Sequence, residues 1–123
     1  MDREEFEKVV QEVFDALPAQ FHATMDNVHI VVEELPALHT HIRRGIRSGG
    51  VLLGLYEGIP LTKRGVDYGM YPVVPDRITL FRQNIQAVSR DDQDLRVKIR
   101  ETLIHEIGHY YGMSETEIRR AGY

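Results

Sequence analysis

The first eighteen residues have the apolar spacing of an amphipathic helix. The apolar positions follow one another every three or four residues, at Phe6, Val9, Val10, Val13, Phe14 and Leu17. Asp2 and Glu5 have the spacing of a capping box at the start of such a helix, and Pro18 ends it. The pattern predicts a helix with one apolar stripe that covers a sheet.

Three later segments have the composition of β-strands. Val28–Glu34 is rich in β-branched residues, and its nearly continuous apolar run predicts a buried strand. Val51–Tyr56 is expected to be a second strand, in which Gly54 marks a bulge or a close approach of another backbone. Residues Arg77–Arg82 alternate in the manner of a third strand.

A long helix is expected in the last third of the chain. It should begin near residues 89–92, because aspartates in a first turn suit the helix dipole. Its apolar residues form two stripes, one with Leu95, Ile99, Leu103 and Ile107 and one with Val97, Ile104 and Tyr111. Such a helix is buried on two sides, and its polar stripe, Lys98, Glu101, His105 and His109, should face a cleft.

The remaining segments give weaker signals. Residues 36–50 suggest a short helix and a turn, 60–75 an irregular excursion and 84–90 a connection, and Ser114 should cap a last short helix that ends at Gly122. His39 and His41 could hold a second metal ion, but this spacing is more typical of a polar loop. Tyr68 or Tyr71 could assist an oxyanion, although anchoring the loop is the preferred interpretation.

Composition indicates an ordinary globular protein. Of the 123 residues, 42% are hydrophobic and 28% are charged, which suits a single domain over residues 1–123. No apolar run is long enough to span a membrane, and the acidic N-terminus lacks the apolar core of a signal peptide. We therefore expect a cytoplasmic protein without a membrane partner.

Charge and cysteine content narrow the function further. The net charge of -4 disfavours nucleic acid as a partner, and we interpret Arg43, Arg44 and Arg47 as solvated charges on a loop or short helix. The chain has no cysteine, so any metal must be held by histidine and carboxylate. That donor set favours a catalytic zinc over a structural one.

The expected long helix carries the sequence His-Glu-Ile-Gly-His at residues 105–109. Residues four apart on a helix lie one above the other, so His105 and His109 can direct two imidazoles at one metal ion. Glu106 lies off that axis and can take a proton from a metal-bound water as general base. The alternative is that His105 and His109 lie with Glu101 on a solvated polar face of the helix and bind no metal. Gly108 argues against it. A glycine within a helix costs about 1 kcal/mol relative to alanine, and this cost is more easily understood if another part of the chain must come close to the backbone there.

A catalytic zinc needs a third protein ligand. Gly112 offers a helix end at which the chain can turn back, and Glu115 is the residue placed to return. Ser114 and Glu117 form a capping box, in which Glu115 is also a favourable acid of the first turn. Glu117 or an additional water is the alternative to Glu115 as ligand.

With these residues the chain resembles the minimal zincins, small bacterial proteins of similar length with a zincin-like metallopeptidase fold. The resemblance rests on residues 54–62, 75–81 and 102–112 and covers most of the chain from about Val28 onwards. It implies an α+β fold, with a small mixed sheet of about three to four strands packed against an N-terminal helix and the His105–His109 helix. It also implies one zinc ion held by His105, His109 and the tenth residue after His105, which is typically aspartate in this family and is Glu115 here.

The leading hypothesis is a zinc-dependent metallopeptidase that hydrolyses peptide bonds of a peptide or protein substrate, with Glu106 as general base. An extended substrate would lie along a sheet edge above the helix. One alternative is a non-catalytic metal-binding module with a regulatory or interaction role. A second is an anti-repressor-type metallopeptidase that acts on a DNA-binding partner.

Overall fold

The computed structural model of the chain describes residues 1–123 except 24, 26, 38–46, 49 and 60–75. The helices are α1 (Arg3–Asp15), the 3-10 helix η1 (Ala19–Phe21), α2 (Arg82–Ala87), α3 (Asp92–Tyr110) and α4 (Glu115–Arg120). The strands are β1 (Val28–Glu33), β2 (Arg47–Ser48), β3 (Val51–Leu52), β4 (Gly54–Glu57) and β5 (Asp76–Phe81). The expected α+β class is confirmed.

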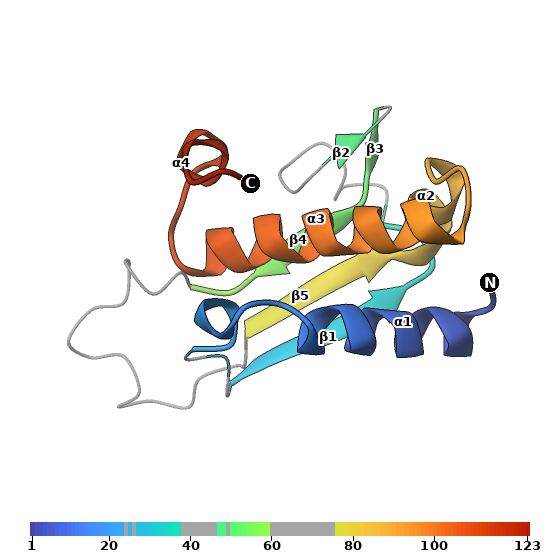
Figure 1. The fold of residues 1–123 in the computed structure, drawn as a ribbon, viewed down its shortest axis with the longest axis horizontal. Helices are drawn as coiled ribbons and strands as arrows, with labels where there is room; N and C mark the ends of the chain where they lie inside the picture. Colours follow the sequence, from blue (N-terminus) through green and yellow to red (C-terminus); the bar gives the residue numbers. More distant parts are fainter. Residues whose placement is uncertain (24, 26, 38–46, 49, 60–75) are drawn as a thin grey trace.

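The main sheet is mixed, as the sequence resemblance implied. It has three strands in the order β1-β5-β4, with β1 parallel and β4 antiparallel to β5 (Figure 1). The register places Ile30 and Tyr56 on either side of Ile78 in the central strand. The short strands β2 and β3 form a separate antiparallel pair. Strand β4 is therefore an edge of the three-stranded sheet.

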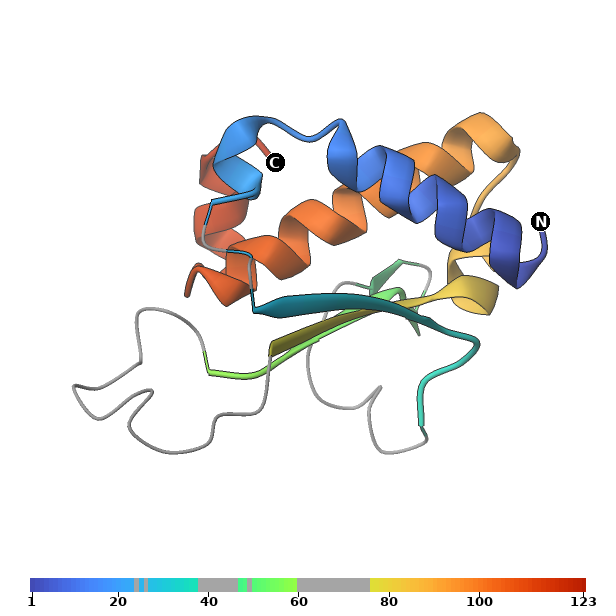
Figure 2. The same cartoon turned by 90° about the horizontal axis from the view of Figure 1, so that it is seen from below.

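The helices α1 and α3 cover one face of this sheet, as Figure 2 shows. The apolar stripe of α1 is buried at Phe6, Val9 and Val10, as predicted, and Asp2 caps the helix by accepting a hydrogen bond from the Glu5 amide (2.8 Å). The core also includes, among others, Val32, Tyr56, Ile78, Leu80, Ile85, Leu95, Ile99, Leu103 and Ile107. None of the helices in the described ranges combines the length and apolar composition needed to cross a membrane.

Helix α3 begins as the sequence predicts, but its two halves differ in burial. Asp91 caps it by accepting a hydrogen bond from the Asp94 amide (2.7 Å). In its first half only Leu95 and Ile99 are buried, and Val97 is 46% exposed, so the second apolar stripe does not extend to Val97. In its second half, every residue from 102 to 108 is buried.

The structure corrects several boundaries. The strand expected over Val51–Tyr56 is interrupted at Leu53, because β3 pairs with β2 whereas β4 pairs with β5. Most of the connection expected at residues 84–90 belongs to α2, and Arg47 lies in β2 rather than in a loop or helix. The expected excursion at residues 60–75 and the residues His39, His41, Arg43, Arg44, Tyr68 and Tyr71 lie outside the described residues.

Gly54 allows α3 to approach β4 closely. A Cβ atom at this position would lie 2.5 Å from Cγ2 of Thr102, 3.1 Å from the main-chain oxygen of Thr79 and 3.4 Å from Cγ of Glu106. The first distance is shorter than real Cβ atoms show, and the second is tighter than most of their contacts. The expectation that Gly54 marks a close approach is therefore confirmed, although the closest atom belongs to a side chain of α3.

Arg82 connects the ends of three elements. Its guanidinium donates hydrogen bonds to the carboxylate of Glu34, with Nε at 2.7 Å from Oε2, and to the main-chain oxygen of Met1 (2.8 Å). The hydrogen bond from Arg82 lowers the pKa of Glu34 below its ordinary value. The pair thus holds the end of β1 and the start of α1 against the junction of β5 and α2.

Gly54→Ala should lower the free energy of unfolding by about 1–3 kcal/mol, because the added methyl group overpacks the contact between α3 and β4. Thr102→Ser removes the Cγ2 atom that the methyl group would meet and retains the hydroxyl that donates to the main-chain oxygen of Lys98 (2.7 Å). Urea unfolding should show that Thr102→Ser partly restores the stability of the Gly54→Ala protein. Equal stability of wild type and Gly54→Ala would contradict the packing described for this contact.

Glu34→Gln should reduce stability at neutral pH and have a smaller effect in acid. A carboxylate with a lowered pKa stabilises the fold above its unfolded-state pKa, and this contribution is lost as pH falls through the folded-state pKa. Urea unfolding of both proteins between about pH 6 and pH 3 should show their difference shrinking as the pH falls. A constant difference over this range would mean that the ionised pair is not its source.

Candidate metal centre

His105 and His109 lie one turn apart in the second half of α3. His105 is 7% exposed and His109 is half-buried. Nδ1 of His109 donates a hydrogen bond to the main-chain oxygen of Met113 (3.0 Å), since a carbonyl oxygen can only accept. This contact orients the ring and directs Nε2 of His109 towards the start of α4.

The chain reverses direction between α3 and α4. Gly112 has a φ of 86°, in the left-handed region that glycine adopts readily, and the amide of Met113 bonds to the main-chain oxygen of Gly108 (2.9 Å). Ser114 then caps α4 through the expected capping box, in which its hydroxyl and the Glu117 carboxylate each accept an amide hydrogen bond at 3.2 Å. The Glu117 carboxylate is thus occupied by the cap.

The Glu115 carboxylate lies between the two histidines. Its Oε2 is 2.9 Å from Nδ1 of His105, and its Oε1 is 2.9 Å from Nε2 of His109. The side chain of Glu115 is 40% exposed. The structure therefore brings together the three residues that the sequence analysis selected as ligands, His105, His109 and Glu115.

Gly108 explains how α4 comes this close to α3. A Cβ atom at Gly108 would lie 2.6 Å from Cδ1 and 2.8 Å from Cγ1 of Ile118, which is 1% exposed. The glycine leaves room for Ile118, and the packing of Ile118 fixes α4 with Glu115 at its first position. The expectation that something approaches the helix at Gly108 is confirmed, and the neighbour is a side chain of α4.

The donor atoms fit zinc in type and number, but they touch one another in this structure. Across the described ranges, no group of three or more histidines, cysteines or acids is spaced as a metal site. The Glu115 oxygens contact both rings directly at 2.9 Å, whereas nitrogen and oxygen ligands of one tetrahedral zinc are about 3.3 Å apart. The donor set itself, two imidazoles and one carboxylate, is one that suits zinc.

Glu106 lies on the side of α3 that faces β4. Its side chain is 1% exposed, and its Cγ is the neighbour that a Cβ at Gly54 would meet at 3.4 Å. Glu106 therefore occupies the interface between the helix that carries both histidines and the edge strand of the sheet. The sequence placed it beside the candidate ligands, and the structure adds that it is enclosed.

A buried polar contact joins two of the passages on which the sequence resemblance rests. The Tyr56 hydroxyl at β4 donates to Oδ2 of Asp76 at the start of β5 (2.9 Å), and the Tyr56 ring lies edge-on to Tyr110 of α3, with centroids 5.9 Å apart. The contact fixes the sheet below the last turn of α3. Spacing along the chain gave no indication of it.

Sequence reasoning also missed the main-chain acceptors of the two histidines. Nε2 of His105 lies 3.3 Å from the main-chain oxygen of Tyr123, and Nδ1 of His109 lies against Met113 as described above. A main-chain oxygen can come from any residue type, so no sequence signal identifies these two positions. These two contacts can be identified only in the folded chain, which reverses direction at Gly112.

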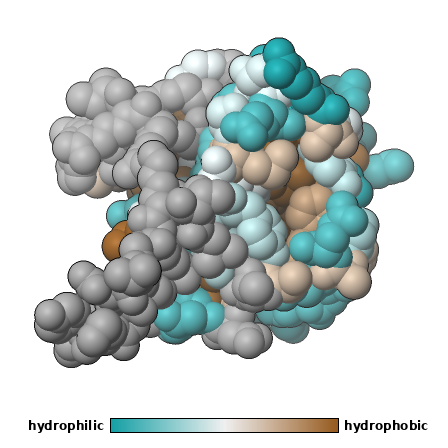
Figure 3. Space-filling view, turned by 90° about the vertical axis from the view of Figure 1, so that its left-hand side faces the viewer, coloured by the Kyte–Doolittle hydropathy of each residue, from teal (hydrophilic) through white to brown (hydrophobic). Residues whose placement is uncertain are grey.

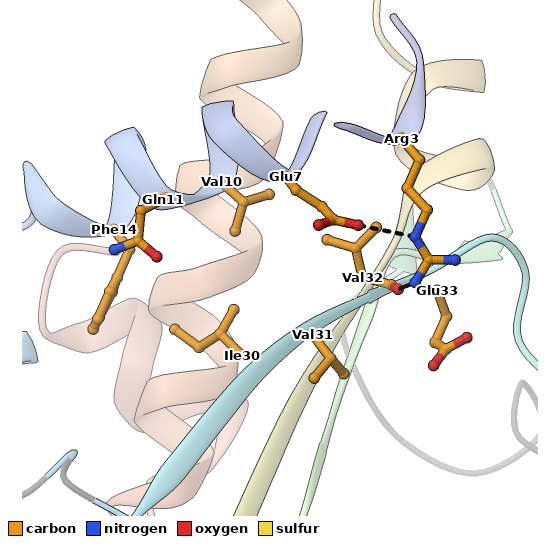
Figure 4. Close-up of a pocket in the computed structure, with 9 residues that line it drawn as sticks. All are labelled: Arg3, Glu7, Val10, Gln11, Phe14, Ile30, Val31, Val32 and Glu33. Carbon is orange, nitrogen blue, oxygen red and sulfur yellow. Dashed lines mark hydrogen bonds and ion pairs between the residues drawn. The ribbon is translucent and has the colours of Figure 1, made fainter. Parts of the chain in front are cut away.

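The surface near these residues is distinct from a cavity between α1 and β1. Figure 3 shows the end of the molecule at which α3 gives way to α4, where apolar surface is visible between hydrophilic side chains. A cavity of about 420 Å³ lies elsewhere, between α1 and β1, and is lined by Arg3, Glu7, Val10, Gln11, Phe14 and residues 30–33 (Figure 4). This cavity contains none of the candidate ligands.

Comparison with known proteins supports the fold and the family that the sequence resemblance indicated. A solved structure of a conserved hypothetical protein from Thermus thermophilus matches with a TM-score of 0.57 and 22% identity over 98% of each chain, which shows a shared fold. A comparison with curated proteins finds no match. The model of the zincin-like metallopeptidase family matches residues 25–123, a span that includes all three candidate ligands and Glu106.

Membership of this family implies a metal ion, for which the paired histidines and Glu115 are the chemically suited donors. The match extends over most of the chain and agrees with the mixed sheet and the helix that carries the histidines. The chain therefore belongs to the zincin-like metallopeptidase family.

Proposed function

We propose that this protein is a zinc-dependent metallopeptidase in which His105, His109 and Glu115 hold one zinc ion. The observation that carries the proposal is the Glu115 carboxylate, whose two oxygens lie 2.9 Å from a ring nitrogen of each histidine. Glu115 follows His105 by 10 positions and His109 by 6 positions in the sequence, and the turn at Gly112 brings the three residues together. Family membership supports the reaction class.

The binding residues are oriented before any ion arrives. His109 is held by Met113, and α4 is held by the contact of Ile118 with Gly108. Oriented ligands lose little conformational freedom on binding, which favours affinity. Zinc, when bound, supplies a Lewis acid that acidifies water and polarises the carbonyl group of a peptide bond.

Glu106 acts as the general base in this proposal. Glu106 directly follows His105 in the sequence. It lies in the enclosed second half of α3, where it is 1% exposed. A carboxylate shielded from bulk water exerts a stronger field on a nearby proton than one in solution does. Glu106 accepts the proton of the attacking water, which makes the water a better nucleophile.

The substrate is an extended segment of a peptide or protein. Strand β4 is an edge of the described sheet and runs beside α3, with Glu106 between them (Figure 1). An extended chain that adds to a sheet edge uses main-chain hydrogen bonds, which depend little on sequence. A peptide along β4 would pass the carboxylate of Glu106 on its way across the histidines.

One observation favours a second candidate function, a metal-binding module without hydrolysis. Glu106 is almost fully buried, so access of a water and a peptide to its carboxylate requires the residues around it to move. A protein that binds zinc through His105, His109 and Glu115 but never exposes Glu106 would have a regulatory or interaction role. Measurement of turnover separates the two candidates.

Glu106→Gln should retain zinc and reduce peptide hydrolysis by about 100- to 10,000-fold, because the amide cannot accept the proton. The assay uses zinc-loaded protein with a mixture of unstructured proteins and peptides, and cleavage is followed by mass spectrometry. Glu101→Gln is the matched control, since Glu101 is exposed on the same helix. Cleavage by Glu106→Gln at the wild-type rate would refute the role of Glu106, and no chelator-sensitive cleavage by any of the three proteins would favour the binding module.

A further inference from the structure

We propose that the outer edge of β1 binds an extended peptide segment in which aliphatic and basic residues alternate. The site consists of the cavity between α1 and β1 and the unpaired main-chain groups beside it (Figure 4). It lies at the opposite edge of the sheet from β4, because the strand order is β1-β5-β4. This second site contains none of the residues of the metal centre.

Alternate residues of β1 direct their main-chain groups away from the sheet. The main-chain oxygen of Asn27 accepts a hydrogen bond from the amide of Asp76 at the start of β5 (3.2 Å). In a parallel ladder every second residue bonds to the same neighbour, so the odd-numbered residues of β1 bond to β5. The main-chain groups of Val28, Ile30 and Val32 therefore face outwards.

The open part of this edge is short and is closed at both ends. The Val28 amide donates to the main-chain oxygen of Met25 (3.1 Å), and the Arg3 guanidinium donates to the main-chain oxygen of Val32. Between these contacts, the Val28 oxygen, both main-chain groups of Ile30 and the Val32 amide make no hydrogen bond with any described residue. Closed ends protect a sheet edge against aggregation. The edge is thus suited to a short added strand, which gains affinity from main-chain hydrogen bonds.

The side chains on the α1 side of β1 form an apolar hollow. Ile30 and Val32 point towards α1, and Val10 and Phe14 of that helix lie opposite them (Figure 4). Phe14 and Ile30 are only partly buried, and they line the cavity of about 420 Å³. A strand added to β1 would direct every second side chain to this face. Aliphatic side chains suit these positions, because burial against apolar walls is favourable.

The other face of β1 carries a negative charge. Val31 and Glu33 point away from α1 (Figure 4), and Glu33 is exposed and forms no ion pair with another described residue. Among the described residues that line the cavity, Arg3 is the only cation, and it is bound to Glu7 (2.9 Å). The side chains of an added strand that lie on the Glu33 face are therefore expected to be lysine or arginine, since opposite charges on neighbouring strands attract.

Charge also disfavours a second copy of the chain as the occupant. On the face of Glu33, β1 carries His29 and Val31 in addition, and neither has a permanent positive charge. Pairing of two β1 edges would therefore offer neither Glu33 carboxylate a cation from the partner strand. A basic segment supplies that cation, and the net charge of -4 attracts it to the protein.

The first experiment titrates the ¹⁵N-labelled full chain with the end-blocked peptide Lys-Val-Lys-Val-Lys, whose integrity is checked by mass spectrometry. The largest amide shifts should occur in β1 and in the side of α1 that faces it. The outward amides of Ile30 and Val32 should exchange with deuterium more slowly in the complex. Lys-Ser-Lys-Ser-Lys and Glu-Val-Glu-Val-Glu are the control peptides, and each should bind at least about tenfold more weakly.

The second experiment repeats the titration with two charge variants. Glu33→Lys should weaken binding of Lys-Val-Lys-Val-Lys by about five- to tenfold, because attraction becomes repulsion. Glu101→Lys is the matched control, since it changes the net charge equally at an exposed position of α3 that does not line the cavity. Its affinity should stay within about twofold of wild type. Equal affinity of the two variants, or no binding by the wild type, would overturn the proposal.

Two further outcomes would identify a different site or occupant. Shifts concentrated in β4 and α3 would place the peptide at the proposed substrate edge, which overturns the β1 site and leaves the proposed function standing. A chain that sediments as a dimer, with the Ile30 and Val32 amides protected before peptide is added, would identify a second copy as the occupant and also overturn the proposal. Loss of zinc binding or hydrolysis at the metal centre would leave the result expected at β1 unchanged.

Discussion

The candidate site depends on the close packing of α4 against α3 at Gly108. Ile118 fills the space that a side chain at Gly108 would take, and Glu115 lies one turn earlier on the same short helix. A helix of six residues gains little stability by itself, so its position must come from this contact and from the caps at its ends. The distance from Glu115 to the histidines is thus set by an apolar contact that involves no ligand.

A second glycine has the same effect on the opposite side of the site. Gly54 lets the side chains of Thr102 and Glu106 enter the space above β4, so that α3 lies close to the edge strand. Because both approaches occur along residues 102–108, this half of α3 is enclosed while the first half remains amphipathic. The helix directs its two histidines towards Glu115 of α4 and Glu106 towards the sheet, which in the proposed function would separate metal binding from proton transfer.

The sequence predicted the parts of this arrangement that depend on residue type and local spacing. The periodicity of α1, the aspartate cap of α3 and the capping box at Ser114 are local, and all are present. The histidines and Glu115 were selected by spacing and by the turn expected at Gly112, and they meet in the structure.

The remaining features could not be predicted because they depend on tertiary contacts. The interruption at Leu53 arises from the choice of strand partners, and the acceptors at Met113 and Tyr123 are main-chain atoms, to which residue type gives no guide. The burial of Glu106 depends on the absence of a side chain at Gly54, fifty-two positions earlier.

The most direct test of the central claim is the metal content of the purified protein after zinc is supplied and excess is removed. Elemental analysis should find about one zinc per chain in the wild type, none in His109→Ala and a reduced amount in Glu115→Ala. Glu117→Ala should retain the ion, since the Glu117 carboxylate caps α4 and does not contact the histidines in the described structure. Absence of zinc from the wild type, or equal zinc in wild type and His109→Ala, would contradict a centre built on His105, His109 and Glu115.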